Sequence, residues 1–350
     1  FIDEDEESET KYREISTLLT DPTLTNNKEE MKQVILIISN ISDNHHRTND
    51  FSDKIGRIIK LIKESLKNNF SNQELFSFFK NNKMTLLQLV NENIITINDE
   101  LFENKQSSDS DEEAVIEDIC KFFSPEIEDN CTFKLCKFKS VKFSGPLEQF
   151  KEYRTKGQNS SYICELIRQD SVEEFITYVN KNNISLSSTI NESIFETNSF
   201  LINKRPHLIE YAAFFGSIQI FQYIKINRPD LLNGDLWIYG IHSNNAEMIH
   251  ILEENQIFPK NRTYEGCMVE SIKCHHNEIF NYIKDVLFDR SKWRENNFED
   301  DYYDGLYDEL SLNKMPLFYH NFELIPDDFE SLFKLIFYLN QYEYSSLVKF

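Results

Sequence analysis

The sequence predicts an all-α chain in which a helical N-terminal region precedes a solenoid of helical repeats. Three observations predict this fold class. Apolar residues recur at steps of three and four, which is helical spacing. The 350 residues include only 8 Gly and 8 Pro, few for a chain rich in strands. A short pattern also recurs about every 30 residues, which is typical of repeats built from one supersecondary unit.

The N-terminal part divides into a charged stretch and a helical region. We interpret residues 1–20 as an acidic, solvated tail. Residues 21–105 form the helical N-terminal region. Two groups of apolar residues recur there at helical spacing: Met31, Val34, Ile35, Ile38 and Ile41, then Ile55, Ile58, Ile59 and Ile62. Ser71, with Glu74 three positions later, predicts a capping box at the start of a further helix.

Residues 106–156 combine an acidic segment with a basic one. We interpret 106–118 as a flexible acidic linker, with a phosphorylation site as the alternative. The Lys- and Phe-rich stretch over 132–142 predicts an extended, half-exposed segment. Nucleic-acid binding would need a wider basic patch. Because the chain carries 37 Lys and Arg against 59 Asp and Glu, a net charge of -22, we expect neither nucleic acid nor an anionic membrane as partner.

The repeat is clearest over 205–285, where three segments align without gaps. Gly216, Asn244 and His275 share one position, at offsets of 28 and then 31 residues. These residue types tolerate a positive φ, so we expect a tight turn between two helices at each of them. Apolar pairs follow each turn and predict the buried face of a second helix: Ile220 and Phe221, Met248 and Ile249, Ile279 and Phe280.

The stretch from Ala212 to Phe221 resembles the ankyrin repeat. It has the small pair, two variable residues, Gly, a polar residue, an apolar residue, an acid or amide, and two apolar residues. The usual Thr-Pro-Leu-His opening survives only in part, with Pro206 before His207. The chain is similar to a large uncharacterised family of divergent ankyrin-repeat proteins expanded in parasitic protists. This resemblance implies an ankyrin-like array over 157–350.

The resemblance also implies how the array is arranged. A weaker copy precedes the clear ones, with its turn near Asp170. Residues 288–313 read as an acidic, aromatic insertion, and a last copy around Phe337 stops at Phe350. Because the chain opens on Phe1 and ends inside a copy, we expect it to be a fragment of a longer array.

Ankyrin repeats bind proteins, so the resemblance implies a non-catalytic protein–protein interaction module or scaffold. The expected partner-binding residues are the two variable positions before each turn: Phe214, Phe215, His242, Ser243, Lys273 and Cys274. For Phe214 and Phe215, packing against the preceding repeat is an equally open alternative. The acidic charge favours a basic protein partner.

The residue pattern around Cys274 does not predict catalysis. A Cys nucleophile needs a His across a pocket, whereas His275 and His276 are its neighbours in sequence. Zinc binding by Cys267, Cys274, His275 and His276 fits no structural spacing. We therefore expect no enzyme, metal or cofactor. The alternative is an enzyme or regulator whose active part is the N-terminal helical region, with the repeats as targeting module; a structural spacer is a third possibility.

Cysteine usage and hydropathy bear on location. The six Cys contain no Cys-x-x-Cys pair and are too few for a disulfide scaffold, so a reduced, cytoplasmic chain is expected. The longest apolar runs are short, as in Val34 to Ile38, and no segment is predicted to span a membrane.

Overall fold

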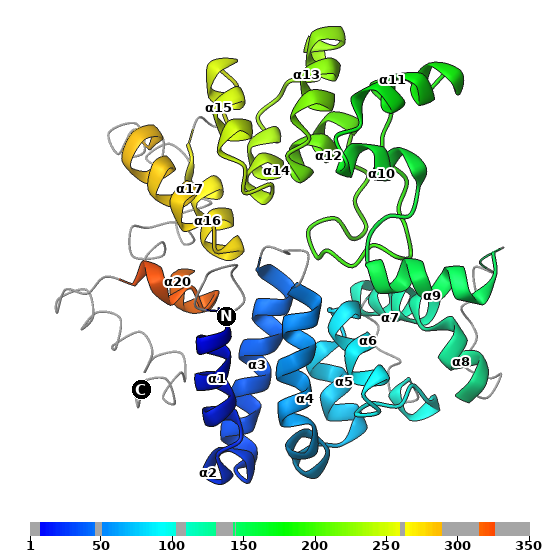
Figure 1. Cartoon of the computed structure of the whole chain (residues 1–350), viewed down its shortest axis with the longest axis vertical. Helices are drawn as coiled ribbons and strands as arrows, with labels where there is room; N and C mark the ends of the chain where they lie inside the picture. The colour runs from blue at the N-terminus through cyan, green and yellow to red at the C-terminus, as the bar shows by residue number, and fades with distance from the viewer. Residues whose placement is uncertain are drawn as a thin grey trace. The chain divides into compact units, whose positions relative to one another are not determined.

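Helices make up the secondary structure of the part of the chain that the computed structural model describes, residues 8–45, 51–102, 110–130, 143, 145–259, 263–288 and 315–325. Within these residues the β structure is one isolated antiparallel bridge between Thr189 and His207. The all-α prediction is therefore confirmed. Figure 1 shows the order of the helices along the chain. The chain divides into a first unit of residues 1–43, 47–159 and 192–202, and a second unit of residues 44–46, 160–191 and 203–350.

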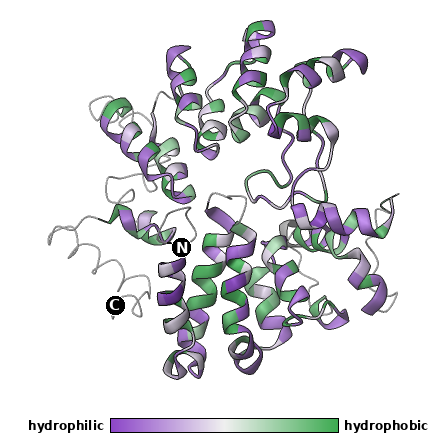
Figure 2. Ribbon diagram, in the orientation of Figure 1, coloured by the Kyte–Doolittle hydropathy of each residue, from purple (hydrophilic) through white to green (hydrophobic). Residues whose placement is uncertain are grey.

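The first unit is built around the two apolar stripes expected from the sequence. Its helices are α1 (Ser8–Leu19), α2 (Pro22–Thr25), α3 (Lys28–Asn44), α4 (Phe51–Asn69), α5 (Asn72–Phe79), α6 (Lys83–Asn91), α7 (Ser110–Phe122), α8 (Ser124–Asn130) and α9 (Leu147–Lys156). Met31 and Ile35 of α3 and Ile59 of α4 are buried in its core. Figure 2 shows both hydrophobic and hydrophilic residues along α4, as expected of an amphipathic helix with one apolar face.

The capping box predicted before α5 is present. The Ser71 hydroxyl accepts a hydrogen bond from the Glu74 backbone N–H at 3.2 Å, and the Glu74 carboxylate accepts one from the Ser71 N–H at 2.8 Å. Two of the N–H groups that have no partner within the helix are satisfied in this way.

Helix α1 replaces most of the solvated tail expected over 1–20, of which 1–7 lie outside the described residues. Leu19 belongs to the core of the first unit. Arg57 donates two hydrogen bonds to the Glu9 carboxylate, and its guanidinium lies 3.7 Å from the centre of the Tyr12 ring. Although this stretch is rich in acidic residues, it forms a helix that packs against α4.

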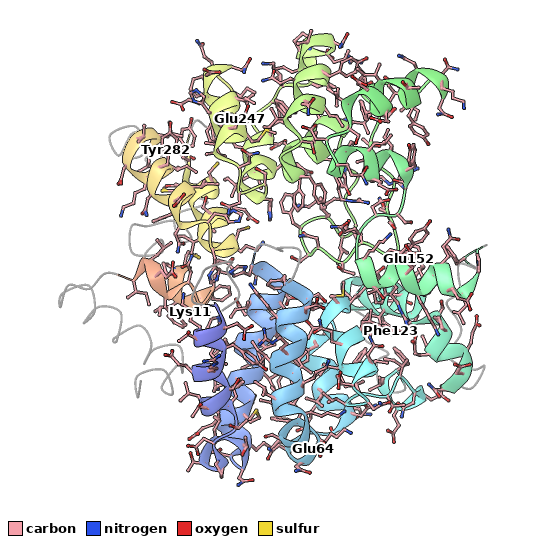
Figure 3. The ribbon with its side chains drawn as sticks, viewed as in Figure 1. Lys11, Glu64, Phe123, Glu152, Glu247 and Tyr282 are labelled. Carbon is pink, nitrogen blue, oxygen red and sulfur yellow. The ribbon has the colours of Figure 1, made fainter. Side chains whose placement is uncertain are left out.

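Helix α7 likewise replaces the flexible linker from residue 110 onward. Ile116, Ile119 and Phe122 recur at steps of three and are buried. The Asp118 carboxylate lies 2.7 Å from the ammonium of Lys83, whose side chain is 3% exposed. Phe123, labelled in Figure 3, is fully buried just after this helix. The Lys- and Phe-rich stretch over 132–142 lies outside the described residues.

The second unit consists largely of paired helices. These are α10 (Tyr162–Arg168) and α11 (Val172–Lys181), α12 (Leu208–Phe215) and α13 (Ile218–Asn227), α14 (Leu236–His242) and α15 (Ala246–Glu254), and α16 (Glu265–Cys274) and α17 (Asn277–Tyr282). The short α20 (Met315–Phe318) is followed by a 3-10 turn, Phe322–Leu324. The first helices pack in sequence, α10 on α12, α12 on α14, α14 on α16, and α16 on α20. The expected insertion beyond Phe288 and the expected copy around Phe337 lie outside the described residues.

A residue with positive φ stands at the turn of every pair. The angle is 66° at Gly216, 49° at Asn244 and 62° at His275, the three positions where the sequence predicts it. Asp170, where the weaker copy was expected, has a φ of 48°. His320, at 58°, marks a fifth such turn after α20, which the sequence pattern did not predict.

At three of these turns, the residue after the turn makes a contact with the backbone of the preceding pair. The Ser217 hydroxyl donates to the carbonyl oxygen of Ile167 at 2.5 Å. His276 Nδ1 lies 2.7 Å from the carbonyl oxygen of Ile241, and Asn321 Nδ2 donates to that of Ile272 at 3.0 Å. Each acceptor stands three residues before the turn of the preceding pair. The same bond therefore recurs with three different side chains.

Candidate functional site

The six predicted partner-binding residues divide by exposure. Phe214 and His242 are each 7% exposed, and Cys274 is fully buried. Phe215, Ser243 and Lys273 are partly exposed. The prediction of a surface position is therefore wrong for Phe214, His242 and Cys274. Phe215, Ser243 and Lys273 remain accessible to a partner from solution.

Phe214 is buried because its ring stacks on the next pair of helices. Its centroid lies 4.8 Å from that of the His242 ring, with 25° between the planes. The sequence left open that Phe214 packs against a neighbouring repeat, but the expected neighbour was the preceding one. Phe215 turns to that side instead: it contacts the Tyr211 ring at 4.7 Å, and the Arg168 guanidinium of α10 lies 5.9 Å from its centroid.

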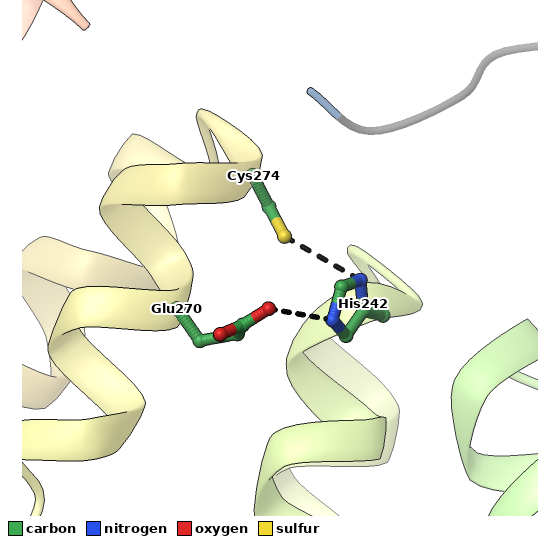
Figure 4. A group of neighbouring side chains, drawn as sticks. All are labelled: His242, Glu270 and Cys274. Carbon is green, nitrogen blue, oxygen red and sulfur yellow. Dashed lines mark hydrogen bonds and ion pairs between the residues drawn. The ribbon is translucent and has the colours of Figure 1, made fainter. Parts of the chain in front are cut away.

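His242, Glu270 and Cys274 meet where α14 packs against α16 (Figure 4). Glu270 and Cys274 are four residues apart in α16, so both side chains project from one face of that helix. Nδ1 of His242 lies 3.4 Å from Sγ of Cys274, and Nε2 lies 2.8 Å from Oε1 of Glu270. The histidine ring therefore stands between a thiol and a carboxylate.

Burial sets the protonation of this group. It lowers the pKa of His242, against the opposing effect of Glu270, and it raises the pKa of the Cys274 thiol well above its ordinary value. Burial alone would raise the pKa of Glu270, but hydrogen bonding to His242 and the charge of Lys273 hold it below its ordinary value. At neutral pH we assign a thiol, a neutral imidazole with its proton on Nε2, and a carboxylate.

This order of groups resembles a nucleophile with its base and orienting carboxylate, but the environment opposes that chemistry. A cysteine nucleophile acts as the thiolate and must be reached by substrate. Cys274 is fully buried, and its pKa is raised. His275 and His276, its neighbours in sequence, contact the backbone oxygens of Tyr319 and Ile241 instead.

The donor atoms suit a metal ion better than a nucleophile. Among the described residues, His242, Glu270 and Cys274 are the one group of at least three His, Cys, Asp or Glu whose donor atoms converge, all within 4.8 Å of one another. The set considered in the sequence differs, because Cys267, His275 and His276 do not join it. Glu270 was not among the residues expected from the sequence, although its four-residue spacing from Cys274 places both on one face of a helix.

The described residues of the N-terminal region contribute no donor to this group. The ionisable groups buried most deeply in the first unit are paired: Lys83 with Asp118, and Arg154 with Glu126 through two hydrogen bonds of 2.6 and 2.8 Å. A search of the described helices for one long and apolar enough to cross a membrane found none. Comparison with models of protein families, with curated proteins and with solved structures gave no match.

Proposed function

We propose that the chain is a divergent ankyrin-repeat protein whose second unit binds another protein without chemistry of its own. The observation that carries this proposal is the repetition of one turn, with positive φ at Asp170, Gly216, Asn244, His275 and His320. The first helices pack one on the next in chain order. In a solenoid each repeat contacts mainly its neighbours, and the array offers an extended binding surface.

The partly exposed residues before the turns define the proposed binding face: Phe215, Ser243 and Lys273. Phe215 is the expected anchor. Its ring is held by Tyr211 and Phe214, at 4.7 and 4.9 Å, so little side-chain freedom is lost when a partner covers it. Aromatic residues, Phe among them, are enriched in the cores of protein interfaces. The net charge of -22 favours a basic protein as the partner.

The proposal is tested with the full chain. Proteins captured from native lysate are identified by mass spectrometry, and each one is then purified for measurement of its Kd. We expect the parent to retain a partner and Phe215→Ala to weaken its Kd by at least about fivefold. Ile226→Ser is the matched control, because Ile226 is 74% exposed on the second helix of the same pair.

Two results would contradict the proposal. One is a partner whose Kd is the same for the parent, Phe215→Ala and Lys273→Ala. The other is the absence of any protein retained above the level of an immobilised unrelated acidic protein. Circular dichroism of each variant verifies that its helix content matches that of the parent.

A further inference from the structure

We propose that His242, Glu270 and Cys274 bind a thiophilic divalent cation, Zn²⁺ by preference, between α14 and α16. The three residues come from consecutive first helices of the second unit, so a cation bound by all of them would cross-link two neighbouring pairs. Of the proposed partner-binding residues, Lys273 contacts Glu270, whereas Phe215 and Ser243 are not among the donors.

The chemistry of the donors points to zinc. Thiolate, imidazole and carboxylate are the three side-chain ligands that protein zinc sites use. A thiolate selects Zn²⁺ over Mg²⁺ and Ca²⁺, which prefer oxygen alone. One thiolate and one carboxylate also balance the two positive charges of the cation, so the occupied site would be neutral with an uncharged His242.

The spacing is close to that of a tetrahedral site. With Zn–S near 2.3 Å and Zn–N near 2.0 Å, the two donors lie about 3.5 Å apart. Sγ of Cys274 and Nδ1 of His242 are 3.4 Å apart. A cation between these two atoms leaves Nε2 facing away. The Glu270 carboxylate must then rotate from Nε2 to become the third ligand, and all three donors already lie within 4.8 Å.

Binding exchanges a proton for the cation. The Cys274 thiol loses its proton to solvent and the sulfur forms a bond to Zn²⁺; His242 and Glu270 bind in the forms they already have. Water completes the four ligands. The Lys273 ammonium, 3.4 Å from Oε1 of Glu270, competes with the cation for the carboxylate. Its side chain is 23% exposed and can turn to solvent, so Lys273→Ala should tighten binding.

Cobalt reports on the site directly. The full chain is freed of metal with a chelator under reducing conditions and titrated with Co²⁺, whose bond to a thiolate produces a charge-transfer absorption in the near ultraviolet. We expect a saturable band at one equivalent, its loss when Zn²⁺ is added, and its loss in Cys274→Ser. Cys267→Ser should keep the band, because Cys267 is also buried in α16 but does not join the group.

Two further variants test the other ligands. His242→Asn and Glu270→Gln should each weaken Co²⁺ binding by at least about tenfold, as loss of a ligand or its close partner does. Zn²⁺ should also raise the Tm of the metal-free, reduced parent, because it binds the folded state, and this measurement needs no variant to fold. The proposal is overturned if the parent shows no thiolate band, if the band survives Cys274→Ser, or if Zn²⁺ leaves the Tm of the parent unchanged.

Discussion

Phe214 shows how one side chain joins two repeats. Its ring stacks on His242 of the next pair and meets Phe215 edge-on at 4.9 Å. The aromatic character that made it a candidate anchor at the surface is used inside the molecule. A large apolar residue just before a turn is therefore compatible with either role, and the packing of the neighbouring helix decides between them.

Phe214→Ala should destabilise the second unit by about 3–5 kcal/mol, because it removes a buried aromatic ring and leaves a cavity. Trp237 is fully buried in this unit, so urea unfolding followed by tryptophan fluorescence reports its stability. Ile226→Ala, at a position 74% exposed, should change the free energy of unfolding by less than about 0.5 kcal/mol. Equal effects of the two variants would contradict the packing of Phe214.

Glu265 should make the stability of the fold depend on pH in the direction opposite to that of a salt-bridged acid. Burial raises its pKa to about 7, and its Oε1 has no hydrogen-bond partner within the described structure. A carboxyl group whose pKa is higher in the folded state binds its proton more tightly there. Its contribution to stability is therefore present at low pH and is lost as the pH rises through about 7.

Glu265→Gln keeps the neutral form at every pH. We compare the Tm of this variant with that of the parent at each pH. The variant should gain in Tm relative to the parent as the pH is raised from about 5 to about 8. The exposed Glu278→Gln of α17 is the control, and its difference from the parent should stay nearly constant. A difference for Glu265→Gln that shrinks with rising pH would show that the carboxylate is stabilised by the fold.

At the scale of the element, two glycines of the second unit should respond oppositely to the same change. Gly216 has a φ of 66°, and a Cβ there would come within 3.2–3.3 Å of Asn245 and Ser243. Gly266 lies in α16, and a Cβ there would meet nothing within 4 Å. Gly216→Ala should cost about 1 kcal/mol or more, whereas Gly266→Ala should stabilise the helix by about 0.5–1 kcal/mol.

Urea unfolding followed by tryptophan fluorescence measures both variants. A destabilised Gly266→Ala would contradict the open space around that position. A neutral Gly216→Ala would contradict the requirement for a left-handed turn.

The elements were predictable where a single periodic pattern determined them. The turns at Gly216, Asn244 and His275 followed from residue type and spacing. Helices α1 and α7 were missed because their charged residues are as numerous as their apolar ones, four of each in α1 and six of each in α7. The turn at His320 was missed because it follows His275 by 45 residues, well beyond the 28 and 31 of the clear copies.

The candidate metal site depended on tertiary packing that the sequence does not contain. Both His242 and Cys274 drew attention as residues before a turn, but their contact arises from the packing of α14 against α16. Local spacing could relate Glu270 to Cys274, since both lie in one helix. It could not show that a ring from the previous pair would stand between them.

The net charge of -22 acts at the scale of the whole molecule. If the partner is basic, long-range attraction accelerates encounter and is screened by salt within about 10 Å at 0.1 M. We expect the association rate constant to fall as NaCl is raised, while the dissociation rate constant changes little. Surface plasmon resonance with the captured partner measures both. An association rate independent of salt would show that charge does not guide the encounter.

The turn residues have a consequence for how such a protein evolves. Asp, Gly, Asn and His all occupy the same left-handed position, and Ser, His and Asn all supply the bond to the preceding pair. Selection on the backbone angle and on one hydrogen bond leaves the identity of each residue free to drift. Helix pairs within one chain can therefore differ at almost every position and still pack, so similarity of conformation can persist after sequences have diverged.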